Sequence, residues 1–204
     1  MASDAKARLV SATMQLMLRQ GYSATGIDGI CSEAGLSKGA FYHSFRSKEE
    51  VAVAALESFY RRGLEELQSI DVSDAPPAER LPLFVERLAD QADALWESGC
   101  LIGGLATEMA LANDELQRQV ALRFDELAGA VASLAEPYVR RARIRGMNAA
   151  SVAEDLLGFI EGSVVLARGH RDPGRLRPAL KRYAIMLRAL AGTRRASPTR
   201  SRRD

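Results

Sequence analysis

Apolar side chains recur every three or four residues along almost the whole chain, which is the spacing of an amphipathic α-helix. Glycine, proline or a capping side chain separates each such segment from the next. The pattern therefore predicts an all-α fold of about nine helices, with a kink at Pro137. The expected helical segments are 4–20, two short helices within 25–48, 47–70, 78–99, the small-residue segment 100–112, 113–146, 148–168 and 177–191.

The chain has 204 residues, 47% of them hydrophobic, which is enough to bury a sizeable core. We expect a small N-terminal domain over residues 1–48, a larger helical domain over 49–192, and a disordered basic tail over 193–204. No run of about 18 apolar residues occurs, and the start MASDAKAR lacks an apolar signal core. We therefore expect no membrane partner and a cytoplasmic location.

The net charge of +2 is concentrated at the end of the chain, because residues 193–204 hold five arginines and one aspartate. The remaining 23 basic and 25 acidic residues give a net charge of −2, so any affinity for a polyanion has to be local. Cys31 and Cys100 form no CxxC pair, and there are only two histidines. We therefore expect no metal site, no disulfide framework and no cofactor.

Residues 25–48 predict two short helices joined by a tight turn. Thr25 is expected to cap the first helix, and Gly35 to end it in the left-handed conformation. Ser37 is expected to cap the second helix, in which Phe41 and Phe45 share one face and point to the core. The rest of that helix is small, hydroxylic and cationic, which suits a DNA major groove better than bulk water. The segment is therefore a predicted helix-turn-helix.

The residues in and around this segment resemble the signature of TetR-type repressors. The matching residues are Ala34-Gly35-Leu36-Ser37-Lys38-Gly39, Phe41-Tyr42-His43, Phe45 and Ser47-Lys48-Glu49-Glu50, with Gly21, Tyr22 and Thr25 upstream. Beyond Val51 the resemblance rests mainly on helix order. Gly99-Cys100-Leu101, followed by Leu105, Glu108 and Met109, is similar to a subgroup that includes the N-ethylmaleimide-responsive repressors.

The resemblance implies a DNA-binding helix that contacts double-stranded operator DNA. The implied DNA-binding residues are Thr25, Ser37, Lys38, Gly39, Ala40, Tyr42, His43 and Lys48. Lys38 is suited to a guanine edge or a phosphate, Gly39 to close backbone approach, and Ala40 to a thymine methyl group. Tyr42, His43, Thr25 and Lys48 are expected on phosphate oxygens. The alternative for these side chains is a solvated helix face.

The resemblance also implies an effector cavity between the helices of the larger domain. Its expected lining is Phe59, Phe84, Trp96, Cys100, Leu105, Glu108, Met109, Phe124, Phe159 and Glu161, with ordinary core packing as the alternative. Glu108 and Glu161 interrupt apolar segments, and an unpaired buried carboxylate is costly. Each is expected to orient a ligand or to pair with Arg168 or Arg123.

Cys100 follows Gly99 at the start of the small-residue segment, where a helix N-terminus can lower the pKa of a thiol. A thiol that senses electrophiles is one interpretation. A packed, unreactive cysteine is the other, since no lysine, arginine or histidine lies within several residues.

The last two helices carry more apolar residues than one core needs. Leu176, Leu180, Tyr183, Leu187 and Leu190 follow a 4-3-4-3 spacing, which is typical of a coiled-coil seam. In the family these helices form a four-helix bundle between two subunits, and the resemblance implies the same homodimer here. We expect Val152, Leu156 and Phe159 to join that seam in the interface.

The leading hypothesis is a ligand-responsive transcriptional regulator, a repressor released from a palindromic operator by a small apolar or electrophilic effector. An effector-independent DNA-binding or interaction protein is the alternative. An enzyme that uses the body cavity is disfavoured, because two histidines, two cysteines and scattered carboxylates assemble no nucleophile, base and orienting group. We therefore do not expect catalytic residues.

Overall fold

The computed structural model describes residues 2–109 and 113–192, and within these ranges it contains nine α-helices, two short 3-10 helices and no strand. The predicted all-α fold is confirmed. The elements are α1 (Ala2–Gln20), α2 (Ile27–Ala34), α3 (Lys38–Ser44), α4 (Lys48–Ser69), η1 (Pro77–Glu79), α5 (Arg80–Trp96), α6 (Leu101–Met109), α7 (Asp114–Ala142), α8 (Ala149–His170), η2 (Pro173–Arg175) and α9 (Leu176–Gly192). The predicted basic tail lies outside the described residues. In the part that is described, no helix is both long and apolar enough to cross a membrane.

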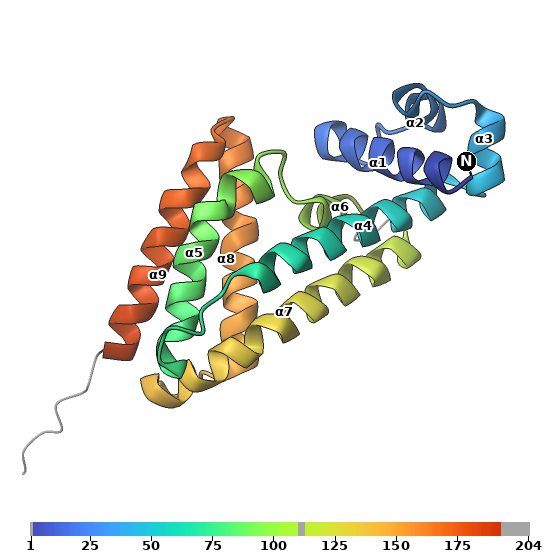
Figure 1. The fold of residues 1–204 in the computed structure, drawn as a ribbon. Coiled ribbons are helices and arrows are strands. Elements are labelled where there is room, and N and C mark those ends of the chain that lie inside the picture. Colours follow the sequence, from blue (N-terminus) through green and yellow to red (C-terminus); the bar gives the residue numbers. More distant parts are fainter. Residues whose placement is uncertain (1, 110–112, 193–204) are drawn as a thin grey trace, which may run out of the picture.

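The first three helices and the start of α4 form a head at one end of the molecule (Figure 1). They enclose a small core of their own, built from Leu9, Ala12, Leu16, Ile30, Cys31, Ala34, Phe41, Phe45 and Val51. Phe41 is fully buried at its centre, as its spacing from Phe45 predicts. Because one face of α3 packs against this core, the opposite face of α3 points toward solvent.

The turn between α2 and α3 follows the predicted chemistry. Gly35 ends α2 with φ of 62°, a left-handed conformation that glycine adopts without strain. Ser37 caps α3 by accepting a hydrogen bond from the backbone N–H of Ala40 at 3.2 Å. Ser47 caps α4 in the same way, accepting from the N–H of Glu50 at 3.2 Å.

The prediction for Thr25 is wrong in two respects. Gly26, not Thr25, occupies the N-cap of α2 and provides no side-chain cap. The Thr25 side chain is instead buried, with 1% of its surface exposed, and its hydroxyl donates to the Gly21 carbonyl oxygen at 2.7 Å. The hydroxyl therefore closes the α1–α2 turn and is not available to a phosphate.

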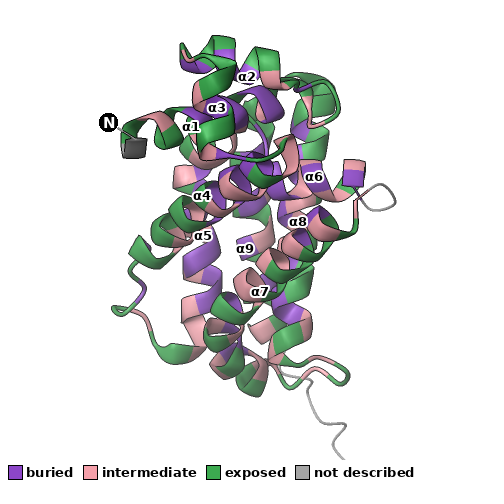
Figure 2. Cartoon of the chain, turned by 90° about the vertical axis from the view of Figure 1, so that its right-hand side faces the viewer, coloured by how far each residue is buried: buried purple, intermediate pink, exposed green. Residues whose placement is uncertain are grey.

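The remaining helices form a body that α4 joins to the head (Figure 1). A second, larger core fills it, to which α5, α7, α8 and α9 contribute their inward faces (Figure 2). Tyr138 of α7 is fully buried there, and its hydroxyl donates to the Leu187 carbonyl oxygen of α9 at 3.0 Å. The buried Tyr138 hydroxyl thus has the partner that its desolvation requires.

An ion-pair cluster fixes α4 against α7. The Arg123 side chain is 14% exposed and pairs with Glu57 of α4 at 3.0 Å and with Glu126 on its own helix. The same guanidinium lies over the Tyr60 ring, 4.9 Å from its centroid. Because Arg123 is satisfied within this cluster, it does not pair with Glu108 or Glu161, as one interpretation of the sequence held.

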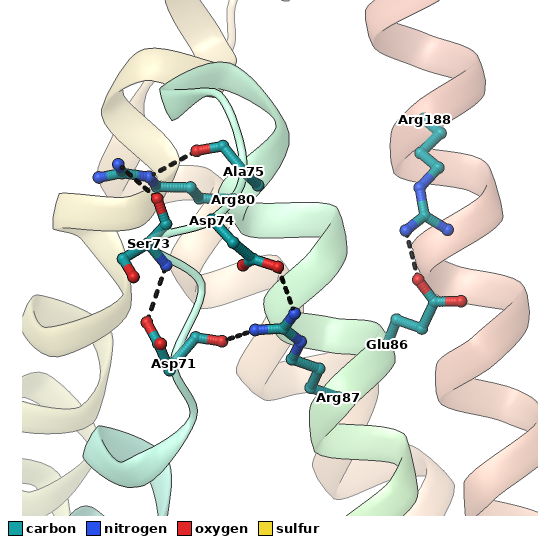
Figure 3. Close-up of polar contacts among 8 residues, drawn as sticks. All are labelled: Asp71, Ser73, Asp74, Ala75, Arg80, Glu86, Arg87 and Arg188. Atoms are coloured by element: carbon teal, nitrogen blue, oxygen red, sulfur yellow. Dashed lines mark hydrogen bonds and ion pairs between the residues drawn. The ribbon is translucent and has the colours of Figure 1, made fainter.

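The connection between α4 and α5 is held by two arginines of α5 (Figure 3). Arg80 donates to the Ala75 carbonyl oxygen at 3.1 Å, and Arg87 contacts Asp74 at 2.8 Å and the Asp71 carbonyl oxygen. The same view shows Glu86 of α5 paired with Arg188 of α9. These contacts attach the segment after α4 to α5, and α5 to α9.

The boundary after α7 differs from the prediction. The helix continues through Pro137 but ends at Ala142, where Arg143 takes a left-handed φ of 51°. Gly146 therefore lies in the following turn and does not end the helix. Asn148 caps α8 as predicted, in a reciprocal capping box with Ser151.

Candidate nucleic-acid interface and effector cavity

The outer face of α3 is free of the head core. Phe41 points inward, whereas the Tyr42 side chain is 57% exposed and meets Phe41 only edge to face, at 5.3 Å between ring centroids. His43 and Gly39 are exposed, and Ala40 is half-buried. The helix therefore presents a phenol, an imidazole and a stretch of bare backbone together to solvent.

Lys38 begins this face and is held by an ion pair with Asp28 of α2, at 2.7 Å between Nζ and Oδ1. Both side chains are largely exposed, so the pair is screened by water and contributes little stability. Lys38 can leave Asp28 for another anion at small cost.

Gly39 has no packing reason to be glycine in the free protein. A methyl group built at this position would meet only the Ser37 Oγ, at an ordinary contact distance of 3.6 Å. Alanine would also favour the helix by up to about 1 kcal/mol. The lack of a side chain leaves the backbone of α3 accessible from outside.

Lys48 and Ser37, two further predicted contacts, have partners inside the head. The Lys48 Nζ donates to the Tyr22 carbonyl oxygen at 3.1 Å and lies 4.0 Å from the centroid of the Tyr22 ring. The Ser37 hydroxyl oxygen accepts its capping bond from Ala40. Both side chains thus order the segments that flank α3, whatever else they contact.

A cavity of about 460 Å³ lies where the head meets the body. Its walls come from the end of α1 and the turn after it, from Cys100 and almost the whole of α6, and from α7 and α8. The lining residues are Met17, Leu18, Gly21, Tyr22, Cys100, Leu101, Gly103, Gly104, Leu105, Ala106, Thr107, Glu108, Phe124, Glu161, Val164, Val165 and Arg168. Most of them are apolar or small, so the few polar groups decide what the cavity can recognise.

Glu108 connects the cavity to the head. Its carboxylate accepts hydrogen bonds from the backbone N–H groups of Tyr22 and Ser23, at 3.1 and 2.9 Å, and from the Ser23 hydroxyl at 3.0 Å. Gly21 permits this approach, because a side chain there would collide with the Glu108 carboxylate and would also have to adopt a φ of 83°. One side chain of α6 therefore holds the α1–α2 turn by three bonds.

Arg168 forms a second connection on the other side of the cavity. It extends from α8 and donates to the Leu18 carbonyl oxygen near the end of α1, at 3.2 Å. Gly99, with φ of 93°, makes room for it, because a methyl group at that position would lie 2.8 Å from the guanidinium. The end of α1 is thus bonded to both α6 and α8.

Glu161 and Cys100 both line the cavity and interact with each other. Burial raises the pKa of Glu161, and the Cys100 thiol beside it offsets part of that rise. Burial and the neighbouring Glu161 carboxylate raise the pKa of Cys100 far above its ordinary value. Both effects favour the protonated thiol of Cys100 over the thiolate that electrophile sensing requires.

Half of the expected effector residues line this cavity. Cys100, Leu105, Glu108, Phe124 and Glu161 do so, whereas five others lie elsewhere. Phe59, Phe84 and Met109 are packed in the body core, Trp96 borders a separate cavity of about 240 Å³, and Phe159 stacks on Tyr183 with ring centroids 4.4 Å apart. The wall from α1 was missed, because no sequence pattern links Leu18 or Gly21 to residues more than eighty positions later.

The predicted dimer seam is mostly core of the same chain. Val152, Leu156, Leu176, Leu180 and Leu187 are each at most 3% exposed and pack within the body, so they are corrected to core residues. The buried positions of the 4-3-4-3 stripe of α9 pack within the chain, where α9 contacts α5, α7 and α8. The large exposed apolar residues of α8 and α9 are Val165, Leu166, Ile185 and Met186, each more than half exposed, with Leu190 less exposed and Phe159 and Tyr183 half-buried.

Comparison with known proteins gives the same architecture from an independent direction. Residues 9–55 match bacterial regulatory proteins of the tetR family, and residues 77–182 match the C-terminal domain of LmrA/YxaF-like transcriptional regulators. The transcriptional regulator AcuR of Cereibacter sphaeroides is 37% identical over 120 residues, which are 57% of this chain and 54% of AcuR. The regulator YxaF of Bacillus subtilis is 29% identical over 192 residues, 91% of this chain and 96% of YxaF.

The expected likeness to the N-ethylmaleimide-responsive subgroup is also present. The repressor NemR of Escherichia coli is 26% identical over 144 residues, 69% of each chain. Among solved structures, a TetR regulator from Chloroflexus aurantiacus has a TM-score of 0.79 at 25% identity, covering 92% of this chain and 96% of that one. The head, the body and the sequence matches agree, and the chain belongs to the TetR family of bacterial transcriptional regulators, with a C-terminal domain of the LmrA/YxaF-like type.

Proposed function

We propose that this protein is a homodimeric repressor that leaves a palindromic operator when a reversible small-molecule effector fills the cavity between head and body. The observation that carries the proposal is the position of the cavity: one wall is the end of α1, and Glu108 bonds that wall to α6. A ligand in this space touches the DNA-binding head directly. Effector binding and head position are therefore coupled through shared residues.

In the DNA-bound state, α3 lies in the major groove with Tyr42 and His43 on the phosphates. Lys38 exchanges Asp28 for a guanine edge or a phosphate, Gly39 allows the backbone close to the bases, and Ala40 meets a thymine methyl group. Ser37 and Lys48 keep their bonds within the head and approach phosphates through their remaining hydrogen-bonding capacity. Thr25 is left out of this set, because its side chain is buried.

Two heads are needed for a palindromic site, and the exposed apolar residues of α8 and α9 are the surface that joins them. Val165, Leu166, Ile185 and Met186 expose enough hydrocarbon to favour burial against a second copy. A two-fold interface places the same patch on both subunits. The two recognition helices must then sit about 34–36 Å apart, one turn of DNA.

Release from DNA follows as a population shift. A ligand that binds better when Glu108 and Arg168 have moved apart favours a head position in which the two recognition helices no longer match successive grooves. The α4 helix transmits the movement, since it starts in the head core and is locked to α7 by Arg123. The effect is limited by the difference in ligand affinity between the two states.

A reversible ligand fits this cavity better than an electrophile does. Attack on an electrophile needs a thiolate, and burial beside Glu161 disfavours that form of Cys100. We expect Cys100 in the folded protein to react with N-ethylmaleimide much more slowly than in the denatured protein, as measured by mass spectrometry. Rapid modification of Cys100 that frees the DNA, together with no release in Cys100→Ser, would support the interpretation that Cys100 senses electrophiles.

The operator hypothesis is tested by selecting duplexes from a random library with the purified full chain and sequencing the bound fraction. We expect an enriched inverted repeat whose half-sites lie about 10 bp apart or a multiple of that spacing. Compounds are then screened for release of the selected duplex. Enrichment of an unrepeated half-site would contradict the dimer, and failure to enrich any sequence would contradict operator recognition.

A further inference from the structure

The charged groups of the cavity differ in how far they are already satisfied. Glu108 accepts three hydrogen bonds from the head, and Arg168 donates to the Leu18 carbonyl oxygen. Glu161 forms no ion pair among the described residues, and its carboxyl group interacts with the Cys100 thiol beside it. The cavity therefore contains a carboxylate for which the described part of the chain provides no counter-ion.

The rest of the cavity suits a hydrocarbon body. Leu101, Leu105, Phe124 and Val164 supply apolar walls from three helices. A volume of about 460 Å³ lies within the range of small-molecule sites and admits one aromatic ring with a short chain. Arg168 is exposed and Glu161 is half-buried, so water screens the charge of Arg168 more than that of Glu161.

We propose that the cavity binds an apolar amine whose ammonium group donates to the Glu161 carboxylate while its hydrocarbon part packs on Phe124 and Leu105. The Glu161 carboxylate is half-buried, so its charge is only partly hydrated, and a bound cation would offset the cost of that lost hydration. Hydrogen bonds between two charged groups are also stronger than neutral ones. A neutral ligand leaves the charge uncompensated, and an anionic ligand adds a second negative charge beside it.

This inference names the ligand class for the cavity of the proposed function, and it is tested without DNA. Three probes with the same phenylbutyl carbon skeleton, 4-phenylbutylamine, 4-phenylbutan-1-ol and 4-phenylbutanoate, are titrated into the purified full chain by calorimetry. We expect the amine to bind about tenfold or more tighter than the alcohol, and the carboxylate to bind most weakly. Tighter binding of the carboxylate than of the amine would overturn the inference and assign recognition to Arg168.

Two variants test whether Glu161 is the partner. Glu161→Gln keeps the shape but removes the charge, so the amine should lose its advantage over the alcohol. Gly103→Ala should do the same by another route, because its methyl group would collide with the Glu161 carboxylate and displace it. Gly129→Ala on α7 is the matched control: Gly129 does not line the cavity and its added methyl group meets no atom within 4 Å, so the amine should keep its preference.

The outcomes separate this inference from the proposed function. An amine that binds through Glu161 but leaves the selected operator duplex bound would support the ligand class and contradict effector control. An amine that fails to bind at millimolar concentration, or that binds Glu161→Gln as tightly as the wild type, would overturn the ligand class. Operator selection by the unliganded protein would stand in either case.

Discussion

The candidate DNA-binding groups of the head lie on its outer surface, whereas the candidate ligand-binding groups of the body line an internal cavity. In the head, Phe41 closes the inside of α3, so the groups that can meet a partner are all outside. In the body, the helices stop short of complete packing where they meet α1, and the groups that can meet a ligand are inside. A surface site keeps its charges hydrated at little cost, whereas an internal site holds a charge such as that of Glu161 at a cost which a ligand can relieve.

This difference has a consequence for how each site tolerates change. A side chain added to the outer face of α3 meets water and leaves the fold intact, so it affects binding alone. A side chain added inside the body meets other atoms and affects stability and binding together. Four predictions test that contrast.

The largest effect is expected on α9, where buried and exposed apolar residues alternate. Leu180→Glu places an unpaired charge in the body core, where Leu180 is fully buried, and should cost more than about 4 kcal/mol and unfold the body. Met186→Glu changes a side chain that is more than half exposed, and should leave the melting temperature nearly unchanged while producing monomers. Thermal melts and sedimentation velocity measure both. If Leu180→Glu were folded and monomeric, that result would support the prediction that Leu180 lies in the dimer interface.

Next in size is the loss of DNA affinity in Gly39→Ala. The methyl group has space in the free protein but would stand between the α3 backbone and the bases, so affinity for the selected duplex should fall on the order of tenfold or more. The melting temperature should stay the same or rise, because alanine is the better helix former. Gly63→Ala on α4, where a methyl group also meets no atom, is the matched control and should bind as the wild type does. Equal affinities of Gly39→Ala and Gly63→Ala for the duplex would contradict the proposal that α3 lies in the major groove.

The same contrast explains what could be predicted from the sequence. The helices and the inward side of α3 follow from local spacing, and so Phe41, Phe45, Gly35 and Ser37 were placed as the structure has them. Thr25 was not, because its hydroxyl has two local uses, a helix cap or the Gly21 carbonyl, and only the packed turn decides between them. The local sequence thus limits the hydrogen-bond partners of the Thr25 hydroxyl to two but does not decide between them.

The body was harder to predict for a physical reason. A 4-3-4-3 stripe shows that one side of α9 is buried, but the burial can be against α5 or against a second chain, and the spacing is identical in both cases. The aromatic residues of the body present the same ambiguity between core and cavity. Glu108 and Glu161 were informative because a carboxylate in an apolar segment needs a partner, although the sequence did not show that the partner of Glu108 is the head.

The third prediction concerns that contact between the two regions. Glu108→Ala leaves the N–H groups of Tyr22 and Ser23 without their acceptor, which should cost about 1–3 kcal/mol of head stability and loosen the α1–α2 turn. Hydrogen exchange at these two amides should rise accordingly. Glu33→Ala is the control within the head, because its ion pair with Arg19 is exposed and contributes little. Unchanged exchange at Tyr22 and Ser23 in Glu108→Ala would mean that Glu108 does not hold the turn.

The smallest effect is the dependence of stability on pH in Glu161→Gln. Burial raises the pKa of Glu161 in the folded state, so the folded protein holds this proton more tightly than the unfolded chain does. The stabilising contribution is complete below the ordinary carboxyl pKa near 4.5 and is lost as pH rises through the folded value. Glutamine stays neutral throughout. Glu161→Gln should therefore gain stability over the wild type as pH rises from 5 to 8, as measured by urea unfolding.

The matched carboxylate on the surface of the head should respond in the opposite direction. The Arg19 guanidinium lowers the pKa of Glu33, so the contribution of Glu33 is present above its ordinary pKa and is lost as pH falls. Glu33→Gln should thus lose a little stability relative to the wild type at high pH, where Glu161→Gln gains. The other titratable groups at the cavity are the same in the wild type and in Glu161→Gln; they are Cys100, Glu108, Arg168 and Tyr22. The difference between the two proteins in the pH dependence of the unfolding free energy therefore arises mainly from Glu161. Parallel stability curves for the wild type and Glu161→Gln across this range would mean that Glu161 already has a counter-ion in solution, and the amine would then have no charge to satisfy.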